Sequence, residues 1–400
     1  MSIKLSSRAK RMKPSATIKL FSKAKQMLAQ GIDVVNFGVG EPDFHTPDII
    51  KKAGKQAIDD NFTKYTVTSG IPELKEAIIN KLKRDNGLNY KQNQIVVTPG
   101  AKAAIAEALA VIVDPGDKVL IPAPYWVSYP TQVEMMNGAP IIVETKGGNN
   151  YKISAGQIEK ALGKHTNFSA IILNTPGNPT GSVYTKQELM DIADVCYEKE
   201  IVIIADEIYE KLIYDGNEHF SIASISNEIA DITILVNGVS KAYAMTGWRL
   251  GYAAGPEHII KNMAKVQGQT ASCVTGISQK AAIKALAMDD SEIENMVSTF
   301  KERRDFLLAG LKNIKGIKCN LPLGAFYAFP NVSYYIENSN LQDSKELSEY
   351  ILKNAHVAVV PGSAFGMENH LRFSYANSME NLQEGLARFK NCLQELVSNN

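Results

Sequence analysis

Seven short apolar runs, separated by helical or turn-forming stretches, constrain the fold of this chain more than any other feature. Rich in Ile, Val and Ala, they are residues 94–98 (QIVVT), 118–122 (KVLIP), 139–145 (APIIVET), 169–176 (SAIILNTP), 201–209 (IVIIADEIY), 232–240 (ITILVNGVS) and 250–256 (LGYAAGP). Near-continuous apolar strands that alternate with helices indicate a mainly parallel sheet covered by helices on both faces. The last run follows the sixth too closely for a helical crossover, so we expect it to pair antiparallel.

The pattern changes after Gly255, where helices replace the alternation of strands and helices. One long helix is predicted near Ser291–Lys315, and a smaller unit with both strands and helices follows it. The first segment, to about residue 46, is too short to fold alone, so we expect it to pack against that C-terminal unit. The sequence therefore predicts an α/β protein. Its large domain (47–300) contains a mainly parallel seven-stranded sheet between helices, and a smaller α+β domain combines residues 1–46 and 301–400.

The balance of charges argues against two classes of partner. The chain has 43 basic and 42 acidic residues and a net charge of +1, which leaves no electrostatic footprint for nucleic acid or an anionic membrane. Its basic start lacks the apolar core of a secretory signal, and prolines and glycines break the longest uncharged window, residues 167–185. The 4 cysteines and 6 histidines have neither disulfide nor zinc-ligand spacing. We expect a cytoplasmic protein without a metal.

Polar residues follow several of the predicted strands, and ligand sites in open α/β sheets lie at those carboxyl ends. Asp206 and Glu207 close one apolar run, with Tyr209 just beyond, and Lys241 directly follows another. Three further features accompany them: a Pro-Gly turn into a helix start at Gly100 and Ala101, Asn178 in a turn, and Arg249. The unpaired N–H groups of a helix start suit a phosphate.

One ligand uses all of these groups, namely pyridoxal phosphate. A lysine amine binds its aldehyde covalently, a carboxylate pairs with its protonated pyridine nitrogen, and a helix start with an arginine holds its phosphate. On this interpretation Lys241 is the attachment point, and Arg249 is a partner of the phosphate.

The chain also resembles the fold-type I, class I/II aminotransferases, and among them the bacterial-type aspartate aminotransferase subgroup. The resemblance covers about residues 11 to 376 in the order of the family. It is carried by KPSATI, GEPDF, KYT with GIPELKEAI, PGAK, PYWVSYP, NPTG, DEIY, SKAYAMTGWRLGYAAGP, GAFY, VVPGSAFG and LRFSYA. Each short motif is weak alone, whereas the ordered set is highly specific.

The resemblance implies a role for each cofactor-binding residue. Lys241 would bind the cofactor and shuttle a proton, Asp206 would pair with the pyridine nitrogen, and Trp126 would stack on the ring. Tyr209 and Asn178 would contact the ring oxygen. The phosphate would be held by Gly100, Ala101 and Arg249, with Lys102 and Ser240 beside it. One departure concerns the position three residues before the lysine, where some members of the family have a hydroxyl and this chain has Gly238.

The resemblance also implies how substrate and partner subunit are bound. Arg372 would bind the substrate α-carboxylate with a bidentate fork, close to the backbone of Gly40, and Trp126 and Asn178 would line the same space. Lys102 would meet the distal carboxylate of aspartate or glutamate, and Thr17 accompanies use of prephenate in some relatives. Tyr65 would reach the phosphate of the neighbouring subunit's cofactor, which implies a homodimer with shared active sites.

The predicted function is transfer of the amino group of aspartate or glutamate to 2-oxoglutarate or oxaloacetate, in a ping-pong cycle. Prephenate or an aromatic keto acid as the main acceptor is the first alternative. A carbon–sulfur or carbon–carbon lyase or synthase on the same scaffold is the second. A non-enzymatic sensor would need a DNA-binding module, and a nicotinamide dehydrogenase would need a glycine fingerprint that this sequence lacks.

Overall fold

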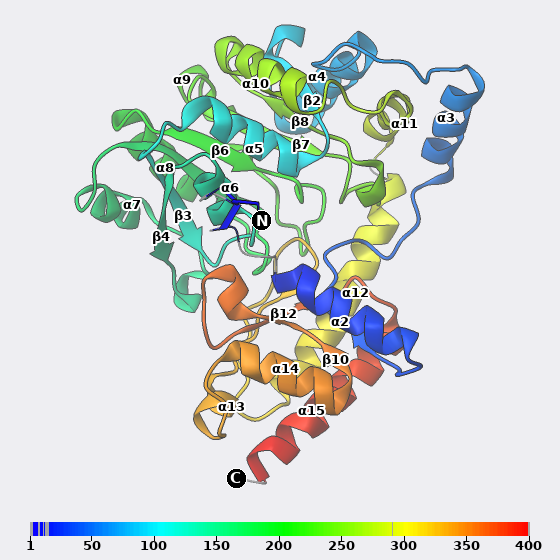
Figure 1. The fold of residues 1–400 in the computed structure, drawn as a ribbon, viewed down its shortest axis with the longest axis vertical. Helices are drawn as coiled ribbons and strands as arrows, with labels where there is room; N and C mark the ends of the chain where they lie inside the picture. Colours follow the sequence, from blue (N-terminus) through cyan, green and yellow to red (C-terminus); the bar gives the residue numbers. More distant parts are fainter. Residues whose placement is uncertain (1–2, 7–8, 11, 13–15, 290, 399–400) are drawn as a thin grey trace.

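A computed structural model describes residues 3–6, 9–10, 12, 16–289 and 291–398, with the backbone alone for residues 16–21. A larger part holds a broad sheet with its helices, and a smaller part holds short strands and several helices (Figure 1). Helix α12 (Ser291–Lys312) runs from the larger part into the smaller one. No helix among the described residues is long and apolar enough to cross a membrane.

The larger part is built on a seven-stranded sheet with the order β2-β8-β7-β6-β5-β3-β4. Its strands are β2 (Ile95–Thr98), β3 (Lys118–Ala123), β4 (Ala139–Glu144), β5 (Phe168–Asn174), β6 (Val202–Asp206), β7 (Thr233–Gly238) and β8 (Gly251–Ala254). Strands β4, β3, β5, β6 and β7 pair in parallel, whereas β8 runs antiparallel to both β2 and β7. The predicted mainly parallel sheet is confirmed, including its antiparallel last strand.

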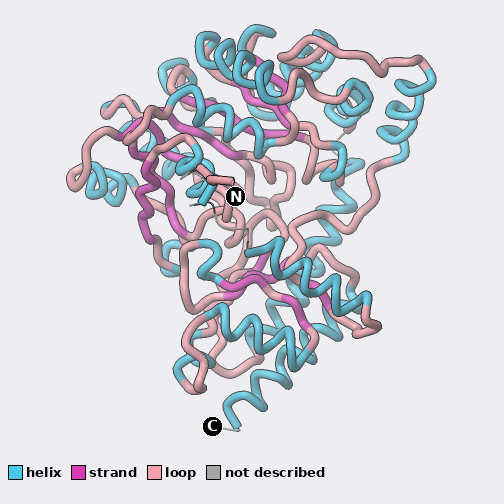
Figure 2. The backbone as a smooth tube through the Cα atoms, in the orientation of Figure 1, coloured by secondary structure: helices cyan, strands magenta, loops and turns pink. Residues whose placement is uncertain are grey.

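Neighbouring residues of the central strands face different cores, which explains their unbroken apolar runs. Ile172 of β5 packs with helices α5, α6 and α10 on one face of the sheet, and Ile171 packs with α7 and α8 on the other. Helices therefore flank the strands on both sides (Figure 2). These helices are α5 (Ala101–Ile112), α6 (Tyr129–Met135), α7 (Ala155–Leu162), α8 (Lys186–Glu198) and α10 (Glu257–Thr270).

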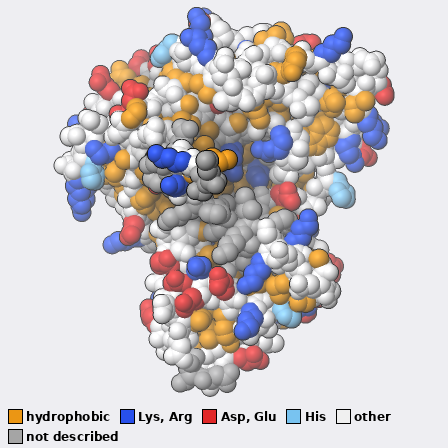
Figure 3. Space-filling view, viewed as in Figure 1, with side chains coloured by type: hydrophobic (Ala, Val, Ile, Leu, Met, Phe, Trp, Pro, Cys, Tyr) orange, Lys and Arg blue, Asp and Glu red, His pale blue; other side chains and the backbone are white. Residues whose placement is uncertain are grey.

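The other helices of the larger part are α3 (Asp48–Asp59), α4 (Pro72–Asn86), α9 (Asn227–Ala230) and α11 (Gly276–Leu286). Single turns of 3-10 helix interrupt the loops at Gln92–Gln94, Gly147–Asn149, Ile222–Ser224, Thr246–Trp248 and Gly362–Phe365. On the face seen in Figure 3, basic and acidic side chains are interspersed, in keeping with the near-neutral charge of the chain.

The smaller part joins the two ends of the chain. Strand β1 (Val35–Asn36) pairs in parallel with β10 (Val357–Ala358), as expected for an N-terminal segment that packs against the C-terminal unit. A second sheet has the order β11-β12-β9 and consists of β9 (Tyr327–Ala328), β11 (Val360–Pro361) and β12 (Leu371–Ser374). Its helices are α2 (Ala16–Ala29), α13 (Ser333–Glu337), α14 (Ser344–Ala355) and α15 (Met379–Ser398). The division of the domains at residues 46 and 300 stays a prediction.

Candidate active site

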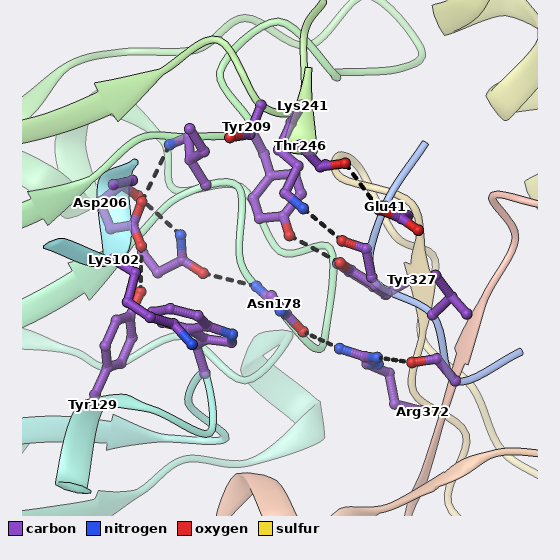
Figure 4. A pocket seen from close by; sticks show the side chains of 18 of the residues that line it. Glu41, Lys102, Tyr129, Asn178, Asp206, Tyr209, Lys241, Thr246, Tyr327 and Arg372 are labelled. Carbon is purple, nitrogen blue, oxygen red and sulfur yellow. Dashed lines mark hydrogen bonds between the residues drawn. The ribbon is translucent and has the colours of Figure 1, made fainter. Parts of the chain in front are cut away.

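A pocket of about 350 Å³ lies beyond the carboxyl ends of β5, β6 and β7. The larger part supplies the strand ends and the start of helix α5, and the smaller part supplies Tyr327, Arg372 and the segment 38–41. Figure 4 shows the side chains from both parts converging on this space. The position agrees with the rule that open α/β sheets bind ligands at their carboxyl edge.

Lys241 extends into the pocket from the loop between β7 and β8, and its amine donates a hydrogen bond to the carbonyl of Gly40. Burial lowers the pKa of Lys241 to about 8, because an ammonium loses its hydration there. The charge of Glu41 opposes this effect, whereas the charges of Arg372 and Arg249 add to it. The amine is therefore a far better base and nucleophile near neutral pH than a solvated lysine.

Asp206, the last residue of β6, faces the pocket and is 4% exposed. The hydroxyl of Tyr129 donates to its Oδ2 atom over 2.6 Å, and the backbone N–H of Ile208 donates to Oδ1 over 3.3 Å. Burial raises the pKa of Asp206 to about 6, although both hydrogen bonds act to lower it. A cationic ligand group beside Asp206 would hold it in the charged form.

Arg372 of β12 is a buried cation with a free donor. Its Nη1 atom donates to Asn178 Oδ1 over 3.0 Å, and Nη2 donates to the carbonyl of Gly38 over 2.8 Å. Its Nε atom is buried without a hydrogen-bond partner among the described residues. The guanidinium carbon lies 4.4 Å from the ring centre of Tyr327, whose hydroxyl is 2.9 Å from that of Tyr209. An unpaired donor on a buried cation is an arrangement that fits an anionic ligand.

The start of helix α5 and Arg249 form a second site suited to an anion. Gly100 precedes the helix with φ of 90°, and a Cβ atom there would lie 2.5 Å from Nη2 of Arg249. The Arg249 side chain is held by the carbonyls of Thr246 and Pro99, at 2.8 and 3.3 Å. Helix-start N–H groups beside a guanidinium match the requirements of a phosphate.

Gly238, which stands where some members of the family have a hydroxyl residue, lies where the backbone leaves no space for a side chain. A Cβ atom on Gly238 would lie 2.8 Å from the Cα atom of Gly251 and 2.9 Å from the carbonyl oxygen of Leu250, since β7 and β8 approach closely there. This backbone has no room for a hydroxyl side chain at that position. Ser240, next to Lys241, lines the pocket instead.

Lys102 lies at the pocket rim, one residue into helix α5. Its amine is 4.9 Å from the ring centre of Trp126, which packs edge-on against Tyr129. Burial, with a contribution from the charge of Arg249, lowers the pKa of Lys102. Burial, the charge of Arg249 and the positive end of helix α5 all disfavour the charged form of Lys102, so an anionic ligand would stabilise it.

The structure brings most of the predicted site residues together. The pocket is lined by Gly40, Ala101, Lys102, Trp126, Asn178, Asp206, Tyr209, Ser240, Lys241, Arg249 and Arg372. Gly100 lies just outside it, against Arg249. Tyr65 is 91% exposed and does not line this pocket. Thr17 belongs to helix α2, but its side chain lies outside the described residues.

Eight of the lining residues were not predicted from the sequence: Gly38, Val39, Asn174 and Ile208, and four with an ionisable or hydroxyl side chain, Glu41, Tyr129, Thr246 and Tyr327. The last four all belong to stretches that carried the family resemblance, and this was the only available signal for them. Thr246 donates a hydrogen bond to Glu41 over 2.8 Å, which ties the loop after β7 to the segment before α3. This contact joins the two sides of the pocket.

Comparisons with known proteins agree with this geometry. The family model "Aminotransferase class I and II" matches residues 32–389. An aspartate aminotransferase of Bacillus sp. (strain YM-2) is 46% identical over 96% of this chain and 97% of its own length. A probable aspartate/prephenate aminotransferase of Aquifex aeolicus is 44% identical over 98% and 99% of the two chains.

Solved structures give the same result. An aspartate aminotransferase from Rhizobium meliloti superposes with a TM-score of 0.94 at 37% identity, covering 99% of this chain and 100% of that one. One from Thermus thermophilus with maleate has a TM-score of 0.92 at 40% identity, covering 98% and 100%. The family predicted from the sequence motifs is confirmed: this chain belongs to the class I and II aminotransferases.

Proposed function

We propose that this protein is a pyridoxal-phosphate-dependent transaminase that moves the amino group of aspartate or glutamate to 2-oxoglutarate or oxaloacetate. The observation that carries the proposal is a single pocket in which the Lys241 amine, with its pKa lowered to about 8, lies near the buried carboxylate of Asp206. The relatives named aspartate aminotransferase support this choice of substrate.

The residues of the pocket fit the cofactor. Among the residues that the structure describes, four cations and two carboxylates line it, and one of these cations has an Nε–H without a partner in that part of the chain, so the pocket favours anionic ligands. Lys241 would bind the aldehyde, Asp206 the pyridine nitrogen, and Arg249 with the start of α5 the phosphate. Trp126, Asn178 and Tyr209 would contact the ring. When bound, pyridoxal phosphate accepts the electron pair left on the substrate's α-carbon when a proton departs.

The protein's own groups would position the substrate and move the proton. Arg372 would bind the α-carboxylate, with its orientation already fixed by Asn178 and the carbonyl of Gly38. The Nζ atom of Lys241, uncharged in a substantial fraction near pH 8, would take the proton from the substrate's α-carbon and later return one. Asp206, in its charged form, would keep the ring nitrogen protonated.

Substrate choice rests on Lys102. Its amine lies at the rim of the pocket that holds Arg372, so it can meet the second carboxylate of aspartate or glutamate. A second candidate is an enzyme that uses prephenate as the amino acceptor, favoured by relatives named aspartate/prephenate aminotransferase. Thr17 and Lys102 would then act together on that acceptor.

A homodimer with shared active sites is part of this proposal. Tyr65 and Val67 are 91% and 60% exposed on the loop after α3, and Ile49 and Ile58 are exposed on α3 itself. A second copy of the chain would cover this apolar set, and Tyr65 would reach the partner's pocket. Sedimentation should give a dimer, and mixing Tyr65→Phe with Lys241→Ala subunits should restore activity above either variant alone.

The cytoplasmic location expected from the sequence also stays a proposal. It is supported by the cysteines Cys196, Cys273, Cys319 and Cys392, all of which are free thiols.

A panel of amino donors and keto acceptors tests the function. Each half-reaction is followed through the absorbance of the cofactor in the purified protein, together with the keto acid released. We expect aspartate and glutamate to convert the cofactor with stoichiometric formation of keto acid. Release of ammonia or a thiol without need for an acceptor would indicate a lyase. A purified chain that binds no pyridoxal phosphate would contradict the proposal.

A further inference from the structure

Asp206 ends strand β6 and Glu207 follows it directly, and the proposed reaction uses only the first of these two carboxylates. Asp206 lines the pocket, whereas Glu207 does not and its side chain is fully buried at 0% exposure. This split follows from the strand geometry, since successive side chains of a strand point to opposite faces. A buried carboxylate is costly unless it is paired, so Glu207 needs its own explanation.

Two side chains from the segment that follows β6 contact Glu207. Ser221 Oγ donates to Oε1 over 2.9 Å, and His219 Nε2 lies 2.9 Å from Oε2. The His219 side chain is itself only 7% exposed. Each oxygen of Glu207 therefore has a partner, and His219 is the one that can bring a positive charge.

A buried lysine in the same cluster already has ion-pair partners of its own. Lys81 of α4, 2% exposed, forms an ion pair with the buried Glu210, which also accepts a hydrogen bond from Asn86 over 3.0 Å. Lys211 pairs with Asp85 over 3.0 Å. One side-chain nitrogen or oxygen atom from each of Glu207, Glu210 and His219 lies within 4.8 Å of the others. Lys81 also lies 3.6 Å from Asp85, so its charge is shared between Glu210 and Asp85. Among the described residues Glu207 contacts none of these ammonium groups, so His219 is the partner through which it can gain a positive charge.

The surroundings of His219 favour that protonation. Burial lowers the pKa of His219, but the charge and hydrogen bond of Glu207, and then the charge of Glu210, raise it more, while Lys81 opposes them. The net pKa is above the ordinary value of 6.5. Its Nδ1 atom is buried without a partner among the described residues, so a proton on Nδ1 gains no hydrogen bond there and protonation is favoured by Glu207 and by the charge of Glu210.

We propose that His219 is a positioning residue whose imidazolium balances the buried charge of Glu207, so that Asp206 can carry its own negative charge in the pocket. The inference rests on the proposed role of Asp206 toward the cofactor. Burial is the main cause that raises the pKa of Asp206, and the charge of Glu207 adds to it. Without a compensating cation, a charged Glu207 makes ionisation of its neighbour more costly.

Two variants separate charge from hydrogen bonding. His219→Gln keeps a donor for Glu207 but removes the positive charge, and His219→Gln with Glu207→Gln removes both charges. Affinity for pyridoxal phosphate is measured by fluorescence titration of the full-length chain after removal of cofactor. We expect about tenfold weaker binding in His219→Gln, equivalent to about one pKa unit at Asp206, and recovery to within about twofold in the double variant. Wild-type affinity in His219→Gln, or no recovery in the double variant, would overturn the proposal.

A second measurement does not depend on the cofactor. The imidazole of His219 is titrated by NMR in the full-length chain, with its resonance identified by its loss in His219→Gln. We expect a pKa above 6.5 that falls by about one unit or more in Glu207→Gln. A His219 pKa at or below 6.5 in the wild-type chain, or an unchanged pKa in Glu207→Gln, would reject the charge pairing. Failure of the wild-type chain to bind pyridoxal phosphate would count instead against the proposed function.

Discussion

Arg372 and Asn178 are joined by a hydrogen bond of 3.0 Å that links strand β12 of the smaller part to the loop after β5 in the larger part. The second hydrogen bond, from Arg372 to the carbonyl of Gly38, fixes the guanidinium plane from the other side. Two of its nitrogens are thereby oriented before any ligand arrives, and the buried Nε is left to donate. This is preorganisation of a carboxylate-binding group.

Arg372→Lys is expected to lower kcat/KM for aspartate by roughly 10- to 150-fold. A lysine keeps the positive charge but cannot donate two parallel hydrogen bonds to a carboxylate as a guanidinium does. Losing one such charge-assisted contact costs about 1.5–3 kcal/mol. Steady-state kinetics measure the effect. Arg388→Lys on helix α15, which pairs with Asp33 away from the pocket, is the matched control and should stay near wild type. A loss below about threefold in Arg372→Lys would show that the fork is not used.

Lys241→Ala should still bind pyridoxal phosphate through Arg249 and the helix start, yet lose transamination by at least about 100-fold, since removing a positioned proton carrier typically costs that much. Borohydride reduction of the wild-type protein, followed by peptide mapping, should place the cofactor on Lys241. A label on any other lysine contradicts the assignment.

Tyr129→Phe should move the acidic limb of the pH dependence of pyridoxal phosphate binding, measured on the cofactor-free chain, upward by about one unit. The hydrogen bond from Tyr129 lowers the pKa of Asp206, so its loss raises that pKa above about 6 and the charged form is reached only at higher pH. Activity well above this limb should be largely retained. Asp206→Asn, which lacks the charge at every pH, should instead lose most activity throughout. An unshifted limb in Tyr129→Phe would mean that Asp206 does not control it.

Lys102→Ala should depress the use of aspartate and glutamate by roughly 10- to 150-fold, because a charge-assisted contact to the distal carboxylate is lost. The use of uncharged aromatic amino acids should change far less. Comparing kcat/KM for both classes in the same preparation gives the answer. Equal losses across the classes would assign Lys102 to the cofactor or the fold, and not to the substrate.

The strands were predictable because their burial on two faces leaves unbroken apolar runs. The run at 139–145 became β4 with one residue fewer, whereas the run at 201–209 ended early, at Asp206. It ended there because a turn at residues 208–211 follows and carries Tyr209 toward the pocket. Residue spacing alone could not decide which of the two carboxylates faces the ligand, since that depends on the absolute register of the strand.

The rest of the site depends on contacts between distant segments. Lys241 was found because it follows a strand, but Glu41 precedes the large sheet altogether and reaches the pocket only through the packing of the chain's two ends. Tyr327 and Tyr129 look like core aromatics in sequence, and both are buried. Only the positions of their hydroxyls, against Tyr209 and Asp206, give them a place in the site.

Because β1 pairs with β10, the smaller part can form only after most of the chain has been synthesised. Once Ala254 has been added, the ribosome has made every strand of the large sheet, and Lys241 as well. Strand β10, which pairs with β1, begins only at Val357, and Arg372 is added later still. At about 5–20 residues per second, the interval from Ala254 to Arg372 lasts roughly 6–24 s. During that time the nascent chain has the cofactor-binding residues of the pocket but lacks Arg372, so it cannot bind the substrate α-carboxylate before Arg372 has been added.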